Sequence, residues 1–207
     1  MTLLTGIDPG SHENAVATLD MSGARPRLIS WAKLAREELA TFVSGMSGNL
    51  VIEMVEGVAF DPVRAADLIQ TQRAAGGAEC VAIASGVRYE CLSGRVWRGE
   101  WLRFPTASDK AIRIAVEAVV DFADLPRIYA KDRKHIYDAV GVALAAAPRF
   151  GLRRVAIPAA AMGQIAEEMS GVRRKSTKKR AATLAKKKAA LWATKLPAAL
   201  RSKRKAA

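Results

Sequence analysis

The segment 2–20, TLLTGIDPGSHENAVATLD, sets the architecture of the chain. Residues 2–7 form a short apolar run that leads into an Asp-Pro-Gly turn at Asp8, and residues 14–20 alternate in the manner of a second strand. The sequence therefore predicts a β-hairpin whose first strand ends on a carboxylate.

The apolar residues that follow the hairpin predict strands and helices in alternation, which is typical of an α/β protein with a mixed sheet. A helix should begin at Asp61-Pro62, an N-cap followed by proline at the first helical position. Gly76-Gly77 could end that helix and leave CVAIA as a buried strand, or the helix could continue to about Ser85. The other expected elements are strands at 27–32 and 49–55, helices at 35–46, 107–123 and 132–147, and extended segments at 87–92 and 95–103.

The net charge of +13 is confined to one end of the 207-residue chain. All 20 acidic residues lie in residues 1–170 beside 19 basic ones, whereas residues 171–207 carry 14 basic residues and no acid. We therefore expect a domain at 1–152, a connector at 153–170 and a Lys/Arg/Ala-rich tail at 171–207.

The tail cannot bury much apolar surface, so we expect it to be disordered or only partly helical in isolation. Its cations would bind nucleic acid through counterion release, with a steep dependence on salt and no sequence preference. A purely solubilising tail and a nuclear localisation signal are compatible with the same residues. We favour nucleic-acid binding.

Several other classes of protein are disfavoured by the sequence. No run approaches the roughly 20 apolar residues that span a bilayer, and Asp8 stands where a signal peptide needs an apolar stretch. We therefore expect a cytoplasmic protein without membrane attachment, with the nucleus as the alternative if the tail is a localisation signal. Cys80 and Cys91 form no CxxC or Cys/His cluster, so neither a disulfide framework nor a zinc site is indicated.

Four side chains, Asp8, Glu53, His135 and Asp138, interrupt or border apolar elements where a solvated charge is not expected. Asp8 ends the first strand, Glu53 lies within LVIEMV, and His135 and Asp138 are three residues apart, so they share one helix face. If the two strands are neighbours, the two acids converge at one end of the sheet and the helix can lie across them. Taken singly, each could be an ordinary turn, ion-pair or surface residue.

Carboxylates crowded in this way repel one another unless cations neutralise them. Oxygen ligands suit magnesium, with manganese as a substitute. Two such ions can activate a water and stabilise a departing oxygen without a protein nucleophile, and His135 would be a ligand or a proton shuttle.

Three segments resemble the catalytic blocks of RuvC resolvases: GIDPG at 6–10, VIE at 51–53 and HxxDAVGVALAA from His135. The resemblance covers about residues 2–147 and implies a ribonuclease H-like fold, in which these blocks bind two Mg²⁺ ions per active site through Asp8, Glu53, His135 and Asp138. It implies a homodimeric endonuclease that resolves four-way DNA junctions and leaves 5′-phosphate and 3′-hydroxyl ends. It also favours a helix that continues through Gly76-Gly77, and a bacterial or phage-infected cell as the source.

The same resemblance assigns further residues. Lys110, in Ser-Asp-Lys before a helix, would contact a phosphate or stabilise the transition state. RVWRGEWL is similar to a block of phage-type members, which would put Trp97 and Arg98 near DNA, although Trp97 could equally be a core residue. The residues expected to contact DNA are Phe60, Trp97, Arg98, Lys110, Arg113, Arg173, Arg174, Lys175, Lys178, Lys179, Arg180, Lys186, Lys187 and Lys188.

The sequence departs from the RuvC pattern at the junction-binding positions. The aromatic that bacterial members insert at the crossover falls near Glu56, so Phe60 would have to take that role, and Glu56 is also the rival of Glu53 as a metal ligand. Two other functions therefore stay open: a nuclease of the same fold that trims flaps or forks, and a non-catalytic architectural DNA-binding protein.

Overall fold

A five-stranded mixed sheet with the order β3-β2-β1-β4-β5 lies at the centre of the fold. β1 (Leu3–Asp8) and β2 (Asn14–Asp20) form the antiparallel hairpin predicted from the opening segment, and β3 (Arg27–Leu34) pairs with the outer side of β2. β4 (Asn49–Met54) pairs parallel with β1, and β5 (Tyr89–Ser93) pairs parallel with β4. β1 is therefore the central strand, antiparallel to one neighbour and parallel to the other.

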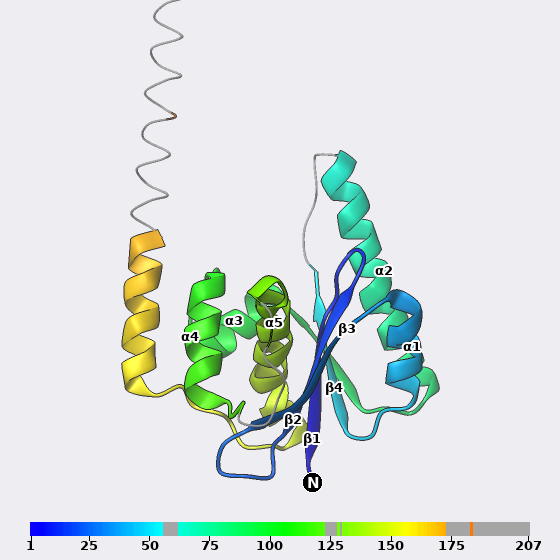
Figure 1. Cartoon of the computed structure of the whole chain (residues 1–207), viewed down its shortest axis with the longest axis horizontal. Coiled ribbons are helices and arrows are strands. Elements are labelled where there is room, and N and C mark those ends of the chain that lie inside the picture. Colours follow the sequence, from blue (N-terminus) through cyan, green and yellow to red (C-terminus); the bar gives the residue numbers. More distant parts are fainter. Residues whose placement is uncertain (56–61, 123–127, 129, 173–182, 184–207) are drawn as a thin grey trace, which may run out of the picture. The chain divides into compact units, whose positions relative to one another are not determined.

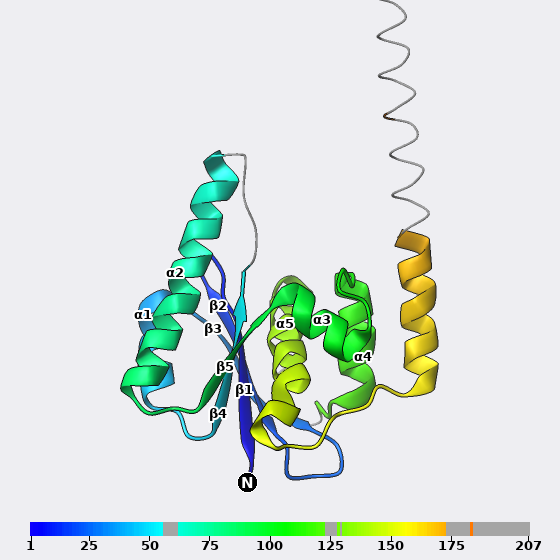
Figure 2. The ribbon, with the colours of Figure 1, turned by 180° about the vertical axis from the view of Figure 1, so that it is seen from behind.

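Helices cover both faces of this sheet. The computed structural model describes residues 1–55, 62–122, 128, 130–172 and 183. The helices are α1 (Arg36–Ser44), α2 (Pro62–Ala84), α3 (Gly94–Leu102), α4 (Asp109–Val119) and α5 (Ala130–Ala146), followed by the 3₁₀ turn η1 (Ala147–Phe150). α1 and α2 lie on one face, and α3, α4 and α5 on the other (Figures 1 and 2). The expected α/β class with a mixed sheet is confirmed.

The chain divides into two compact units, Met1–Ile165 and Ala166–Ala207. The first contains the sheet and helices α1 to α5. Of the second, the structure describes residues 166–172 and 183, so most of the basic tail lies outside the described residues. Within the described residues, no helix is long and apolar enough to cross a membrane.

Residues 153–170, expected to be a connector, contain part of a helix that covers residues 159–172. The segment before this helix is held by hydrogen bonds to α3. The Trp101 Nε1–H donates to the carbonyl of Val155 at 3.0 Å, and Arg154 Nη2 donates to the carbonyl of Glu100 at 2.8 Å. The first compact unit therefore continues past residue 152.

Strand periodicity distributes the side chains between the two faces. Because alternate residues of a strand point to opposite sides, Ile7, Leu50 and Ile52 pack beneath α1 and α2, while Gly6, Asp8 and Glu53 belong to the α5 face. The core cluster on the α1/α2 side consists of Ile7, Val16, Leu39, Val43, Leu50, Ile52, Ala75, Ala78 and Ala82.

At Gly6 the backbone of α5 lies very close to β1. A Cβ atom at this position would overlap the carbonyl oxygen of Ala139 and lie 3.1 Å from the Cβ of Ala143. Only glycine lets the helix backbone lie against the strand at this distance. The next strand position on the same face is Asp8, so this contact also brings α5 close to that carboxylate.

α2 continues without interruption through Gly76-Gly77, so the prediction of a helix that extends to about Ser85 is confirmed. A Cβ atom at either glycine would meet nothing within 4 Å, so neither glycine is required by packing. The buried residues Ala75, Ala78 and Ala82 keep the helix on the sheet. Tertiary packing has thus overridden the weak helix propensity of the glycine pair.

The prediction of an extended segment at 95–103 is wrong, because Gly94–Leu102 is helix α3. The Ser93 hydroxyl caps the helix by accepting from the Val96 N–H. Trp97 and Trp101, which are four residues apart, are both buried. That spacing is a helical period, and the short length of the segment and its aromatic content concealed it.

The close approach at Gly6 makes a stability prediction. Gly6→Ala should destabilise the protein by about 1–3 kcal/mol or more, because the new methyl group forces α5 away from β1. The matched control is Gly77→Ala, which adds a methyl group in open space within a helix and should stabilise by about 0.5–1 kcal/mol. The midpoint of urea unfolding measures both effects, and equal midpoints for Gly6→Ala and wild type would contradict the close packing of α5 on β1.

Candidate active site

The register of the two central parallel strands places Asp8 beside Glu53. Ile7 is paired with Ile52, so the next residue of each strand occupies the adjoining position at the carboxyl end of the sheet. Both acids also share the face that α5 covers. Glu53 is only 7% exposed.

α5 adds two of the predicted residues to this pair. His135 Nδ1 lies 2.7 Å from Asp8 Oδ2 in a direct hydrogen bond, and Asp138, one helical turn later, is only 5% exposed. The charge of Asp8 acts on both Glu53 and Asp138, which shows that the three carboxylates form one electrostatic cluster. The structure therefore brings all four predicted metal-binding side chains together.

A basic residue from α3 completes the cluster. Arg98 Nη2 lies 3.4 Å from Glu53 Oε1 and 3.5 Å from Asp138 Oδ1. The sequence suggests Arg98 as a DNA contact and does not reveal this ion pairing. The signal that could have found it is the helical spacing of the two tryptophans, since a helix that buries Trp97 turns Arg98 toward the sheet end.

Trp97 itself is fully buried and packs against Gly141 of α5, where a Cβ atom would lie 2.7 Å from the indole ring. Trp97 is thus a core residue, the alternative that the sequence offered to a position near DNA, and its role toward DNA stays a prediction. It holds α3 against α5, and its indole also acts on Glu53 at the edge of the acid cluster.

Burial and mutual repulsion raise the pKa values of two of the acids. The pKa of Glu53 is raised to about 8, first by burial and then by the charges of Asp8 and Asp138, against smaller opposing effects of Arg98 and Trp97. The pKa of Asp138 is raised to about 7, again first by burial and then by Asp8. Shifts of this kind indicate a site that is costly to keep ionised without a further cation.

The pKa of His135 is raised as well. The hydrogen bond to Asp8 is the largest cause, and it outweighs the opposing effect of burial. His135 is partly exposed, with 43% of its side chain accessible to solvent. It therefore combines a fixed orientation with access to protons from outside.

The chemistry of these side chains fits a divalent cation. Among the described residues, four buried polar atoms have no hydrogen-bond partner, and all of them belong to this cluster: Glu53 Oε2, Asp138 Oδ1, Arg98 Nε and Trp97 Nε1. Two of these are carboxylate oxygens, the ligands that magnesium and manganese prefer. As the side chains stand, no three His, Cys, Asp or Glu residues in the described ranges 1–55, 62–122 and 130–172 converge closely enough to hold a metal ion. Arg98 lies between two of the would-be ligands.

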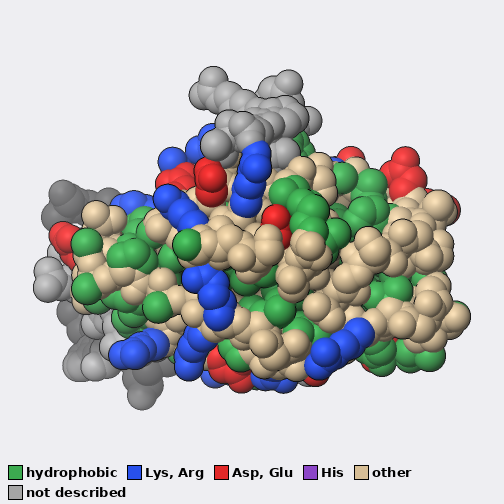
Figure 3. Space-filling view, turned by 90° about the horizontal axis from the view of Figure 1, so that it is seen from below, with side chains coloured by type: hydrophobic (Ala, Val, Ile, Leu, Met, Phe, Trp, Pro, Cys, Tyr) green, Lys and Arg blue, Asp and Glu red, His purple; other side chains and the backbone are tan. Residues whose placement is uncertain are grey.

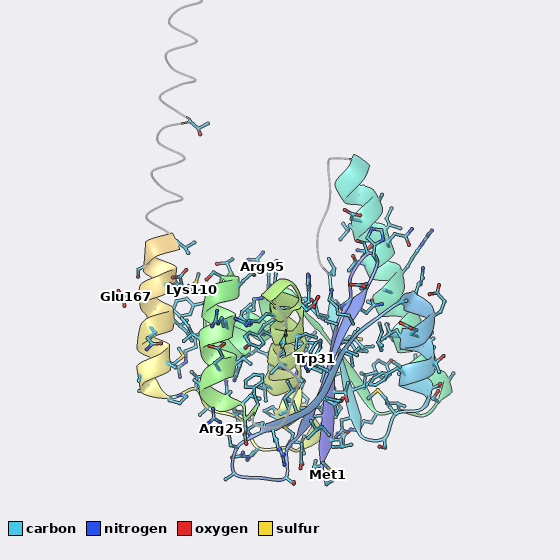
Figure 4. All side chains as sticks on the ribbon, viewed as in Figure 1. Met1, Arg25, Trp31, Arg95, Lys110 and Glu167 are labelled. Carbon is cyan, nitrogen blue, oxygen red and sulfur yellow. The ribbon has the colours of Figure 1, made fainter. Side chains whose placement is uncertain are left out.

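Two other predicted residues lie on α4. Lys110 is exposed at the first turn of α4, at the same end of the molecule as Arg95 of α3 (Figure 4). The neighbouring Asp109 forms an ion pair with Lys134 of α5 at 3.4 Å and adds to the raised pKa of Asp138, so this helix end is near the acid cluster. Arg113 is half exposed and pairs with Glu117 at 2.9 Å.

The remaining predicted residues lie outside the described part of the chain. They are Phe60, the rival ligand Glu56, and the tail residues Arg173, Arg174, Lys175, Lys178, Lys179, Arg180, Lys186, Lys187 and Lys188. Their roles stay predictions.

The opposite end of the molecule, where β1 begins, has a different character. Lys and Arg side chains are scattered over it among Asp, Glu and apolar residues (Figure 3). Arg149 on this side pairs with Glu90 at 3.5 Å and with Glu100 at 3.0 Å, which neutralises part of its charge. The clustering of like-charged, buried acids is therefore a feature of the carboxyl end of the sheet.

This arrangement of a mixed five-stranded sheet, with acids at the carboxyl ends of its two central parallel strands and a helix across them, defines a ribonuclease H-like α/β fold. Solved structures of RuvC have a similar fold. Thermus thermophilus RuvC has a TM-score of 0.56 at 16% identity, over 74% of this chain and 99% of that one.

Two further solved structures are similar to this chain. T. thermophilus RuvC in complex with a Holliday junction substrate also has a TM-score of 0.56, at 17% identity, over 73% of this chain and 97% of that one. The fowlpox virus Holliday junction resolvase has a TM-score of 0.47 at 12% identity, over 72% of this chain and 99% of that one. No protein-family model and no curated protein matches the sequence.

The raised pKa values predict how stability depends on pH. The pKa of Glu53 rises from an ordinary value of 4.5 to about 8 in the folded protein, and that of Asp138 rises from 3.8 to about 7. Between the ordinary and the folded pKa values, the folded state therefore binds more protons than the unfolded state. Their contribution to the unfolding free energy is therefore full below about pH 4 and is lost as the pH rises toward 8. His135, whose pKa is also raised, acts in the same direction.

We expect the metal-free wild type, in EDTA, to lose stability relative to Glu53→Gln as the pH rises from about 5 to about 9. Manganese should reduce this difference at high pH, since metal binding favours the ionised carboxylates. Urea unfolding across this pH range tests the prediction. Parallel pH profiles for the two proteins would contradict the assignment of a desolvated acid at Glu53.

Proposed function

We propose that this chain is a divalent-metal-dependent endonuclease that cuts branched DNA, with the four-way junction as its substrate. The observation that carries the proposal is the cluster of buried, mutually repelling acids Asp8, Glu53 and Asp138, with His135, near the carboxyl end of β1 and β4. As the side chains stand they are not yet close enough to hold a metal ion, so the proposal requires them to move together when a metal binds. Acids desolvated and crowded in this way are costly in a purely structural role. The RuvC-like fold supports the same class of chemistry.

In this proposal Asp8, Glu53 and Asp138 hold two magnesium ions, with His135 as a further ligand or a proton shuttle. When bound, such ions supply the charge that activates a water and stabilises the departing oxygen. Hydrolysis that breaks the bond between phosphorus and the 3′ oxygen would leave 5′-phosphate and 3′-hydroxyl ends.

The protein side chains divide the remaining tasks. The hydrogen bond to Asp8 fixes the His135 ring through Nδ1, and when Nδ1 carries the proton, Nε2 is the atom that can accept one. Lys110, exposed at the start of α4, is suited to contact a backbone phosphate as a point charge. These roles need no protein nucleophile.

Junction resolution requires two opposed incisions, so we propose a homodimer with one site in each subunit. Flap or fork cleavage would keep the same chemistry and change only the substrate, whereas an architectural role would not need the acid cluster. Cleavage assays on junction, flap, fork and linear DNA separate these three functions.

Asp8→Asn should abolish cleavage of a labelled immobile four-way junction in magnesium while DNA binding is retained, because the substitution removes a ligand charge and keeps the side-chain volume. Glu53→Gln should be equally inactive. Glu37→Gln, an exposed acid on α1, is the matched control and should cleave like wild type. Junction, fork, flap and linear duplex are compared on denaturing gels, with EDTA as the metal-free reference.

Paired symmetric nicks in the junction alone would support resolution, and cleavage of flaps or forks would move the substrate to the first alternative. Tight binding without cleavage of any DNA would favour the architectural role. If Glu53→Gln were active and Glu56→Gln inactive, the ligand assignment on β4 would be overturned.

We also propose that the basic tail binds DNA non-specifically. Deleting residues 171–207 should weaken binding to linear duplex and flatten the plot of log binding constant against log salt by roughly 0.9 for each phosphate that the tail had neutralised. A full-length variant in which the nine predicted DNA-binding cations of the tail are changed to glutamine controls for chain length. It should flatten the slope in the same direction as the deletion but by less, because five of the 14 basic residues of the tail remain. Unchanged slopes in both variants would show that the tail does not bind DNA.

A further inference from the structure

Arg98 stands between two carboxylates that the proposed function assigns to metal ions. A single nitrogen atom, Nη2, lies 3.4 Å from Glu53 Oε1 and 3.5 Å from Asp138 Oδ1. The guanidinium thus supplies a positive charge shared by two acids from different elements, β4 and α5. A divalent cation would have to be shared by the same two acids.

Local features of α3 hold the guanidinium at this position. Trp97 is anchored against Gly141, and the Arg98 guanidinium lies 4.8 Å from the centre of its ring. Gly94 leaves room for the ion pair, since a Cβ atom there would lie 2.6 Å from Glu53 Oε1 and 2.8 Å from Arg98 Nη1. The packing at the start of α3 therefore fixes the position of Arg98.

The ion pairs are nevertheless incompletely satisfied. Both distances are longer than those of a close charge-assisted hydrogen bond, about 2.7–2.9 Å. Arg98 Nε and Glu53 Oε2 are buried without hydrogen-bond partners. The Arg98 side chain is 22% exposed, so it has a route to solvent. These ion pairs neutralise the acids only in part, so shorter contacts between the acids and another cation can replace them.

We propose that Arg98 is an internal counter-ion that holds Glu53 and Asp138 together in the metal-free protein and is displaced when a divalent cation binds. The inference rests on the proposed function, because it assumes that these acids are metal ligands. Arg98 is thus a positioning residue: it keeps the acids folded into place before loading, and it competes with the metal for them. Loss of its charge should make the metal-free protein less stable and metal binding tighter.

The test is Mn²⁺ binding to the full chain without DNA, measured by isothermal titration calorimetry, together with the melting temperature in EDTA and in Mn²⁺. Arg98→Gln should lower the melting temperature in EDTA, raise the Mn²⁺ affinity by about tenfold or more, and enlarge the Mn²⁺-induced rise in melting temperature. Arg98→Lys, which keeps the positive charge, should bind Mn²⁺ within a few-fold of wild type. A merely structural arginine would not produce this opposite movement of stability and affinity.

Arg95→Gln is the matched control, since it removes an exposed arginine of the same helix (Figure 4). It should leave both readouts unchanged. If Arg98→Gln is unfolded in EDTA, the proposal requires Mn²⁺ to restore its folding, and failure to fold in both conditions would overturn it. Unchanged or weaker Mn²⁺ affinity in folded Arg98→Gln would overturn it as well, while leaving the proposed function standing. Absence of Mn²⁺ binding to wild type itself would instead remove the proposed metal centre.

Discussion

The contact between the backbone of α5 and the backbone of β1 at Gly6 is the constraint on which the site depends. No side chain separates helix from strand there, because a Cβ atom would overlap the carbonyl oxygen of Ala139. This close approach allows His135 to reach Asp8 and brings Asp138 into the same electrostatic environment. A larger residue at position 6 would lift α5, and the parallel register of β1 and β4 alone would then leave only two of the four groups together.

The acid cluster combines strong desolvation with insufficient countercharge. The basic neighbours of these acids are Arg98, the partly exposed His135 and, for Asp138, Lys134. Their charge does not offset burial and mutual repulsion, because the pKa values of Glu53 and Asp138 are still raised. In a protein selected only for stability, such acids would be replaced or fully paired. The unsatisfied buried atoms concentrated at this one place are consistent with a site that is completed by a ligand.

Much of the fold could be predicted from the sequence, because the hairpin, β4 and the amphipathic helix α4 follow simple periodicities. The grouping of Asp8, Glu53, His135 and Asp138 was predicted because these charges interrupt or border apolar elements, because His135 and Asp138 are three residues apart, and because the motifs resemble those of RuvC resolvases. α3 was missed because its capping serine precedes a glycine and its two tryptophans are typical of strands. The ion pairing of Arg98 depends on the direction in which a buried tryptophan turns that helix. The packing at Gly6 is likewise a tertiary property, and a glycine in a strand indicates close approach without naming the partner.

The order of the cluster along the chain has a consequence for biosynthesis. The cluster is built from four elements spread over most of the first compact unit, so the contacts between its members close long loops; they are Asp8, Glu53, Arg98 and Asp138. During synthesis the Asp8 carboxylate would stay exposed to water until α5 had left the ribosome. A nascent chain with this design has no assembled acid cluster until nearly the whole sheet domain has been translated.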